Sequence, residues 1–119
     1  MIKGIGIDLI QLDRIKQSLA KGDRLVNRIL TINEKKKFND LQSDKRKVEY
    51  LAGRFAGKEA CSKAVGSGIG KLSFQDIEIL ADENGAPRLT IKNHTTYRYF
   101  ISITHTEDYA AAQVVIEEI

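Results

Sequence analysis

The sequence predicts an α+β fold: an N-terminal strand, several helices including one long central helix, and antiparallel strands packed on that helix. The order of the patterns supports this class. Strand-like alternation lies at both ends of the chain and helical spacing fills residues 13–65, which is typical of α+β rather than doubly wound α/β folds. A length of 119 residues fits a single domain over 1–119. The 42% hydrophobic and 29% charged residues indicate a globular chain.

The first strand is expected over residues 1–10, where larger apolar residues alternate with small or polar ones. Gly4, Gly6 and Asp8 share one face of this strand, so that face carries no side chain before Asp8. A bare strand face lets another group approach the backbone closely, and we expect a ligand there. The other face carries apolar side chains: Ile5, Ile7 and Leu9.

Three short helices are expected between this strand and residue 41. Apolar residues at positions 12, 15 and 19 form one helical stripe, and Gly22 ends that helix. The second helix contains four apolar residues, and the side chain of Thr31 or Asn33 caps the third. The expected ranges are 13–21, 25–30 and 34–41.

The longest helix is expected over Asp44–Val65, because apolar residues recur at i, i+3, i+4 and i+7 from Val48. Gly53 and Gly57 lie inside this helix. Each helical Gly costs up to about 1 kcal/mol relative to Ala, so we expect another backbone to pack closely against them. Gly66 follows as the C-terminal cap and opens a glycine-rich loop over 66–70.

The remaining residues have strand character. A hairpin is expected from 73–80 through a turn at 82–85 into 88–91, and a second hairpin joins 99–104 to 110–116 around residues 106–108. Residues 93–96 are expected to form a loop.

Charge is distributed unevenly along the chain. Residues 1–60 contain 14 Lys/Arg and 8 Asp/Glu, whereas residues 61–119 contain 5 and 8. A basic half indicates an anionic partner: nucleic acid, a phosphorylated cofactor or an acidic protein. Aromatic residues make up only 7% and are not interleaved with the basic ones, which disfavours nucleic acid.

No apolar run is long enough to cross a bilayer. The first residues read as a strand rather than an export signal. We therefore expect a cytoplasmic protein that does not enter the membrane.

Glu59 is the most informative single residue. The apolar stripe through Ala52 and Phe55 continues to this carboxylate, and a core-facing carboxylate is costly unless it is paired, protonated or bound to a metal. One alternative stays open, since Lys63 lies four residues later and would form an ordinary surface ion pair with Glu59.

Asp8 is the second candidate. Two carboxylates from different elements hold Mg²⁺ when phosphate oxygens and water complete its shell; alternatively, Asp8 caps the following helix.

Other segments do not match the motifs of common enzyme classes. The loop over 66–70 is not a Walker motif, because Val65 occupies the first glycine position and Leu72 the Ser/Thr position. His105 lacks a Gly-x-Ser-x-Gly elbow, so a serine hydrolase is not indicated, and a local hydrogen bond at a strand end is expected instead. Cys61 is the single cysteine, which excludes a disulfide framework and indicates core packing.

Three segments together resemble the holo-acyl-carrier-protein synthase family, the small bacterial 4′-phosphopantetheinyl transferases. They are GIGIDLI at 4–10, RFAGKEACSKA at 54–64 and SITHT at 102–106, and the likeness extends over essentially the whole chain. The departures are slight: Gly57 and Cys61 replace an Ala and a bulky apolar residue.

The resemblance implies transfer of 4′-phosphopantetheine from coenzyme A to a serine of apo acyl carrier protein, in support of fatty acid biosynthesis, with release of adenosine 3′,5′-bisphosphate. It implies that Asp8 and Glu59 bind Mg²⁺ and that Lys63 contacts phosphate, so these three form the catalytic set. Glu59 is also a candidate base for the serine proton, directly or through a metal-bound water.

The resemblance also assigns the basic half two tasks and implies homotrimers whose sites lie between subunits. The 84–87 turn and His105 would line the site from across that interface. The residues matched to carrier-protein docking are Arg14, Lys21, Arg24 and Arg28. Those matched to coenzyme A binding are Lys45, Arg46, Arg54, Lys63, Gly66, Asn84, Gly85, Pro87 and His105.

A second hypothesis comes from another class. A non-catalytic module that binds a phosphorylated metabolite or RNA through the basic half explains the charge, but it does not explain Glu59 on the apolar stripe.

Overall fold

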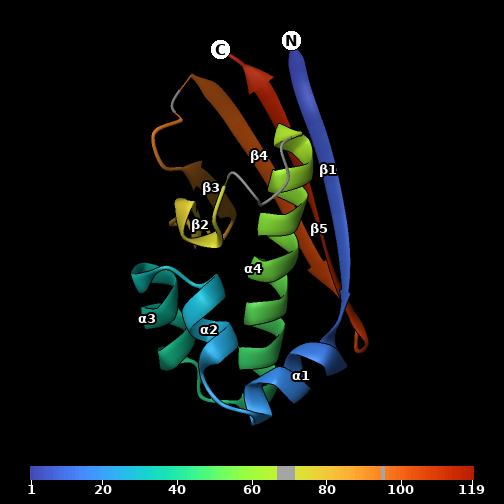
Figure 1. Cartoon of the computed structure of the whole chain (residues 1–119), viewed down its shortest axis with the longest axis vertical. Coiled ribbons are helices and arrows are strands. Elements are labelled where there is room, and N and C mark those ends of the chain that lie inside the picture. Colours follow the sequence, from blue (N-terminus) through green and yellow to red (C-terminus); the bar gives the residue numbers. More distant parts are fainter. Residues whose placement is uncertain (67–71, 95) are drawn as a thin grey trace.

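The structure is a computed structural model that describes residues 1–66, 72–94 and 96–119 (Figure 1). Its element order confirms the predicted α+β class. Within the described ranges, no helix is both long and apolar enough to span a membrane. The elements are β1 (Ile2–Gln11), α1 (Leu12–Ala20), α2 (Arg24–Ile29), α3 (Ile32–Asp40), α4 (Asp44–Val65), the 3₁₀ turn η1 (Phe74–Asp76), β2 (Ile77–Ala81), β3 (Pro87–Ile91), β4 (Tyr97–His105) and β5 (Tyr109–Glu118).

The two ends of the chain meet in one antiparallel sheet of order β1-β5-β4, and β2 and β3 form a separate hairpin. Asp8 of β1 pairs with Ala112 of β5, and Ile103 of β4 pairs with the same residue from the other side. Helix α4 lies across one face of this sheet, and α1, α2 and α3 gather around its N-terminal half (Figure 1). The fold therefore sets Asp8 on β1 against the C-terminal half of α4.

The bare face of β1 lies against α4, which corrects the expectation of a ligand there. A Cβ built on Gly4 would be 1.9 Å from the carbonyl oxygen of Ala64, and one on Gly6 would be 1.8 Å from that of Ala60. Only glycine permits such an approach, so these two residues let strand and helix backbones touch.

The two glycines inside α4 have a different partner from the one expected. A Cβ built on Gly57 would meet the Cδ1 atoms of Ile79 and Ile101 at 2.7 and 2.9 Å, and one on Gly53 would meet a methyl of Ile103 at 3.1 Å. They accommodate side chains of β2 and β4 rather than another backbone. The expected close backbone contact does occur between β1 and α4, but the glycines that permit it are Gly4 and Gly6 of the strand.

The opposite face of the sheet is apolar and exposed. Ile5, Ile7 and Leu9 on β1 are 62%, 64% and 63% exposed, and Phe100 on β4 is 50% exposed. Ile5 and Phe100 both pair with Val115 of β5, so all four side chains lie on one continuous surface. We call these four residues the outer sheet face; none of the helices in the described part of the chain covers it (Figure 1).

Most predicted boundaries are close to those observed, and the long helix has the predicted bounds. Thr31 is the cap of α3: its Oγ1 accepts from the backbone N–H of Glu34 at 3.3 Å, while Glu34 Oε1 accepts from the N–H of Thr31 at 2.8 Å. Gly66 adopts φ 87° and ends α4 as expected. The rest of the expected 66–70 loop, and Thr95 of the 93–96 loop, lie outside the described residues.

The strand expected over 73–80 begins only at Ile77, because Phe74–Asp76 forms a 3₁₀ turn. Ser73 caps this turn, with Oγ accepting from the N–H of Gln75 at 3.1 Å, and Asp76 accepts in return from the N–H of Ser73 at 3.0 Å. The Ser-x-x-Asp capping pattern overrides the strand alternation locally.

Candidate active site

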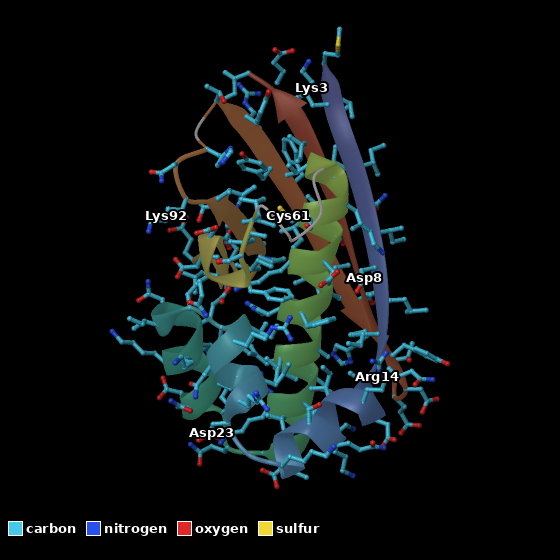
Figure 2. All side chains as sticks on the ribbon, in the orientation of Figure 1. Lys3, Asp8, Arg14, Asp23, Cys61 and Lys92 are labelled. Atoms are coloured by element: carbon cyan, nitrogen blue, oxygen red, sulfur yellow. The ribbon has the colours of Figure 1, made fainter. Side chains whose placement is uncertain are left out.

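Asp8, Glu59 and Lys63 come together where β1 lies against α4 (Figure 2 labels Asp8). Lys63 Nζ is 3.0 Å from Asp8 Oδ1 and also donates to the carbonyl oxygen of Ile7 at 3.0 Å. The lysine therefore bridges helix and strand, and the simple pair with Glu59 within the helix is not the contact it makes. Asp8 acts as the partner of this lysine rather than as a helix cap, since the residue before α1 is Gln11.

Glu59 is half-buried beside Asp8. Burial, followed by the negative charge of Asp8, raises the pKa of Glu59, while the positive charges of Lys63 and Arg28 act in the opposite direction. The negative charge of Asp8 thus disfavours ionisation of Glu59, and a divalent cation between the two carboxylates would neutralise it.

The donor set fits a magnesium ion that is shared with a ligand. Among the residues that the structure describes, no group of three or more His, Cys, Asp or Glu side chains is arranged to hold a metal ion. Mg²⁺ prefers six oxygen ligands and keeps several waters, so one or two carboxylates suffice when substrate phosphates contribute the others. Asp8 and Glu59 provide such a partial shell.

Three of the residues matched to coenzyme A line one cavity of about 200 Å³: Arg46, Arg54 and His105. Arg54 is held in place because its Nε donates to the carbonyl oxygen of Ile79 at 3.3 Å and its guanidinium lies 4.1 Å from the ring centroid of Tyr50. A fixed guanidinium next to a second arginine is well suited to phosphate. We call this the arginine cavity.

The arginine cavity is also lined by two charged residues that the sequence analysis did not select. Lys37 of α3 adds a third cationic side chain, and Glu49 lies with its Oε2 3.7 Å from Nδ1 of His105. This contact differs from the expected local hydrogen bond, because Glu49 lies on α4, 56 positions before His105, and the distance is too long for a hydrogen bond. Lys37 belongs to a run of three lysines, and sequence alone does not show which of the three faces the cavity.

The remaining coenzyme A candidates lie elsewhere in the chain. Lys45 lines a different hollow of about 560 Å³ between α1 and the start of α4. Asn84, Gly85 and Pro87 lie at the β2–β3 turn, where Gly85 has φ 82° and Asp82 Oδ1 accepts from the N–H of Asn84 at 2.9 Å. One chain therefore does not bring all the matched residues to one place.

The four residues matched to carrier-protein docking are all exposed on or beside α1 and α2. Arg28 is the member of this set whose charge acts on Glu59. Its guanidinium lies 5.6 Å from the ring centroid of Phe74, and its positive charge partly offsets the rise in the pKa of Glu59. The set comprises Arg14, Lys21, Arg24 and Arg28 (Figure 2 labels Arg14).

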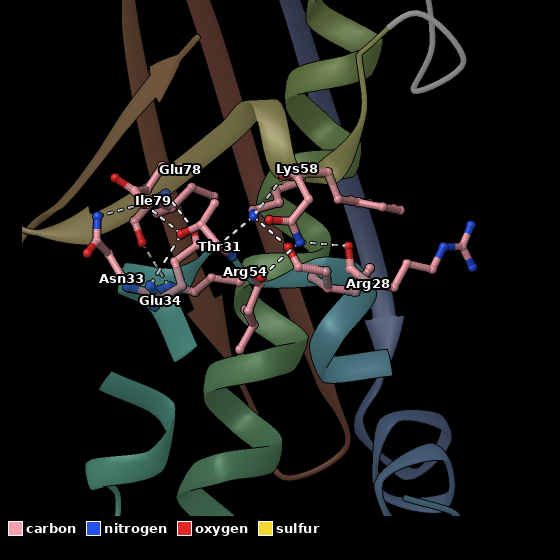
Figure 3. Close-up of polar contacts among 12 residues, drawn as sticks. Arg28, Thr31, Asn33, Glu34, Arg54, Lys58, Glu78 and Ile79 are labelled. Atoms are coloured by element: carbon pink, nitrogen blue, oxygen red, sulfur yellow. Dashed lines mark hydrogen bonds and ion pairs between the residues drawn. The ribbon is translucent and has the colours of Figure 1, made fainter. Parts of the chain in front are cut away.

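The buried ion pair between Lys58 and Glu34 was not identified from the sequence. Lys58 and Glu34 are both 0% exposed, with Lys58 Nζ 2.6 Å from Glu34 Oε1 (Figure 3). Burial lowers the pKa of Lys58, and the Glu34 carboxylate opposes that effect. The sequence did carry a signal for Lys58, because this residue follows Leu51 and Phe55 by seven and three positions, which are also helical spacings.

Cys61 is fully buried, as the packing interpretation predicts. Burial raises the pKa of its thiol to about 12. Almost none of it is thiolate at neutral pH, so this cysteine is not a nucleophile.

Comparison with known proteins agrees with this geometry. The model of the 4′-phosphopantetheinyl transferase superfamily matches residues 4–114. The chain is 52% identical over 118 residues to the holo-[acyl-carrier-protein] synthase of Staphylococcus saprophyticus, covering 98% of this chain and 99% of that protein. It is 53% identical over 120 residues to that of a Geobacillus strain, covering 100% and 99%. A crystal structure of the Bacillus anthracis holo-(acyl-carrier-protein) synthase in complex with CoA (3′,5′-ADP) matches with a TM-score of 0.90 and 48% identity, covering 100% of this chain and 99% of that one. The chain therefore belongs to the 4′-phosphopantetheinyl transferase superfamily and, within it, to the holo-[acyl-carrier-protein] synthases.

Proposed function

We propose that this chain transfers 4′-phosphopantetheine from coenzyme A to a serine of apo acyl carrier protein, in a Mg²⁺-dependent reaction that supports fatty acid biosynthesis in the cytoplasm. The observation that carries the proposal is the group formed by Asp8, Glu59 and Lys63, in which two carboxylates and a lysine from separate elements converge. Such a group suits a pyrophosphate substrate, because that substrate needs its negative charge neutralised before a nucleophile attacks.

The reaction exchanges one phosphorus–oxygen bond for another. The serine Oγ attacks the pyrophosphate phosphorus nearer the pantetheine, a new P–O bond forms, and the bond to the bridging oxygen breaks. Adenosine 3′,5′-bisphosphate leaves with that oxygen and the bonding electrons, and the serine proton passes to a base. Mg²⁺ held by Asp8 and Glu59 would supply charge neutralisation at the pyrophosphate.

The protein's own side chains have separate roles in this proposal. Lys63 offers its ammonium to a phosphate oxygen once the ligand displaces part of its contact with Asp8. Glu59 takes the serine proton, directly or through a metal-bound water.

The arginine cavity is the proposed site for the 3′-phosphate of coenzyme A. It offers Arg46 and Arg54 beside His105, and the B. anthracis relative was crystallised with CoA (3′,5′-ADP). Arg46 and Glu59 are separated by 13 residues of α4, a distance of about 20 Å along the helix. Coenzyme A is proposed to bind between subunits, with its phosphates meeting basic residues of one chain and the carboxylates of another.

A homotrimer is proposed as well, because one chain does not bring the coenzyme A residues together. The outer sheet face exposes four large apolar side chains on adjacent strands, and a second copy of the chain is the occupant that would bury it. In that assembly the coenzyme A residues that one chain keeps apart, including those of the β2–β3 turn and Gly66, would be supplied by neighbouring subunits.

Mass spectrometry tests the proposed activity. The protein is mixed with apo acyl carrier protein, coenzyme A and Mg²⁺, and the carrier protein is expected to gain about 340 Da, with the gain suppressed by EDTA. An unchanged carrier mass with Mg²⁺ present would refute the transfer reaction and favour a binding module for phosphorylated ligands. A gain that persists in EDTA would refute the role of the metal.

A further inference from the structure

We propose that the buried Glu34–Lys58 ion pair is a positioning device that fixes the surface carrying Arg28 relative to Glu59. Glu34 and Lys58 act through the residues they hold in place and touch neither substrate. The inference rests on the proposed function, since it assigns these two residues to the alignment of the carrier-protein serine with the catalytic carboxylate.

Lys58 binds three segments to α4 through one ammonium group. Its Nζ donates to the carbonyl oxygen of Ile29 at 2.6 Å, to Glu34 Oε1 at 2.6 Å and to the carbonyl oxygen of Phe74 at 3.0 Å (Figure 3). These acceptors belong to the end of α2, the first turn of α3 and η1. An ammonium has three N–H donors, so all of them are used.

Glu34 extends the same network to β2. One carboxylate oxygen accepts from Lys58 and from the N–H of Thr31 at 2.8 Å, and the other accepts from the N–H of Ile79 at 2.7 Å. Thr31 in turn donates through Oγ1 to Glu78 Oε2 at 2.6 Å. Every polar atom of the pair therefore has a partner, and the partners lie on different elements.

The network joins the neighbours of two residues assigned to the reaction. Lys58 immediately precedes Glu59 on α4, and the carbonyl that Lys58 binds belongs to Ile29, which immediately follows Arg28 on α2. Gln75 strengthens this link, since its Nε2 donates to the carbonyl oxygens of residues 27, 28 and 30 at 3.1, 3.3 and 2.8 Å. The end of α2 is thus tied to the helix turn that carries Glu59.

Geometry, rather than stability, is the property that such a pair provides best. Buried ion pairs can often be replaced by apolar residues of similar size without loss of stability, whereas removing one partner is costly. A rotation of the α4 turn by about 25° would move the Cα of Glu59 by about 1 Å, given a helix radius of about 2.3 Å. A misplacement of that size costs a reaction about 100-fold.

The test removes both charges together. In the double variant Glu34→Gln/Lys58→Met no charge is left unpaired, and Gln at residue 34 still fits the Thr31 capping box. At a temperature where circular dichroism shows the variant folded, kcat is expected to fall at least 10-fold, while KM for coenzyme A stays within twofold of wild type. Leu51→Ala is the control, because it opens a cavity at a fully buried site of α4 outside the network.

The outcomes separate positioning from general stability. A kcat per folded molecule equal to that of wild type, or a loss equal to that of Leu51→Ala at matched Tm, would overturn the proposal. If the double variant does not fold, the same kcat and KM comparison is made with Glu34→Gln alone at low temperature. Wild-type protein runs in parallel: no mass gain on its carrier protein refutes the proposed function, whereas an active wild type with an equally active double variant refutes only the positioning role.

Discussion

Replacing Gly6 by Ala probes the contact that holds Asp8 near Glu59. A Cβ on Gly6 would lie 1.8 Å from the carbonyl oxygen of Ala60, whereas ordinary contact begins at 3.4 Å. Strand β1 and helix α4 must therefore separate by about 1.6 Å at this point. The obstructing atoms are backbone, so side-chain rotation does not relieve the overlap.

The expected cost has a structural and a catalytic part. Overpacking of this kind costs about 1–3 kcal/mol or more, which lowers Tm by roughly 4–12 °C for a chain of this size. Asp8 lies two residues further along the strand and moves with it, while Glu59 and Lys63 stay on the helix. A shift above 1 Å between groups that act together lowers kcat by about 100-fold.

The assay measures kcat from the rate of carrier-protein mass gain, at a temperature where both proteins are folded. Gly57→Ala is the matched control, because its new Cβ would meet only the movable side-chain ends of Ile79 and Ile101. An Ala in the helix interior gains up to about 1 kcal/mol over Gly, so the control is expected to retain wild-type activity. Wild-type kcat in Gly6→Ala would refute the claim that this strand–helix contact sets the carboxylate geometry.

Three further predictions follow from the same structure. Glu59→Gln is expected to abolish transfer yet raise Tm at pH 7 in EDTA, because burial and Asp8 raise the pKa of Glu59 and the ionised form therefore costs stability above the folded pKa; the gain should vanish below the unfolded pKa, and a lower Tm for the variant at pH 7 would contradict this. Charge reversal at Arg14 and Arg24 is expected to raise KM for carrier protein at least 10-fold with little effect on KM for coenzyme A. Charge reversal at Arg46 and Arg54 is expected to raise KM for coenzyme A with little effect on KM for carrier protein. Equal effects on both substrates in steady-state kinetics would count against the assignment. The Cys61 thiol, with a pKa of about 12, is expected to resist iodoacetamide at pH 8 until the chain unfolds, and rapid labelling of folded protein followed by mass spectrometry would show the site to be open.

Local signals predicted much of the fold. Periodicity and capping residues placed α4 over Asp44–Val65, narrowed the cap of α3 to Thr31 or Asn33, and indicated both hairpins. These features depend on neighbours within a few positions, so they can be read from the chain itself. The pairing of β1 with β5 joins residues about 100 positions apart, and no local pattern encodes it.

The candidate site was likewise predicted only in part from the sequence. Asp8, Glu59 and Lys63 were identified from residue type and resemblance, and the structure brings them together. The glycine face of β1 was interpreted correctly as a place of close approach, but the approaching group is α4, because a bare strand face is equally suited to a helix backbone and to a ligand. Lys58 was missed since a buried lysine is rare and its partner Glu34 lies 24 residues away.

The location of the metal tests the central claim most directly. Crystals of the protein grown with coenzyme A and Mn²⁺, measured at a wavelength where manganese scatters anomalously, would reveal where a divalent cation binds. We expect a peak coordinated by the carboxylates of Asp8 and Glu59 together with a phosphate oxygen of the ligand. A cation bound to the ligand without either carboxylate, or held by other residues, would contradict it.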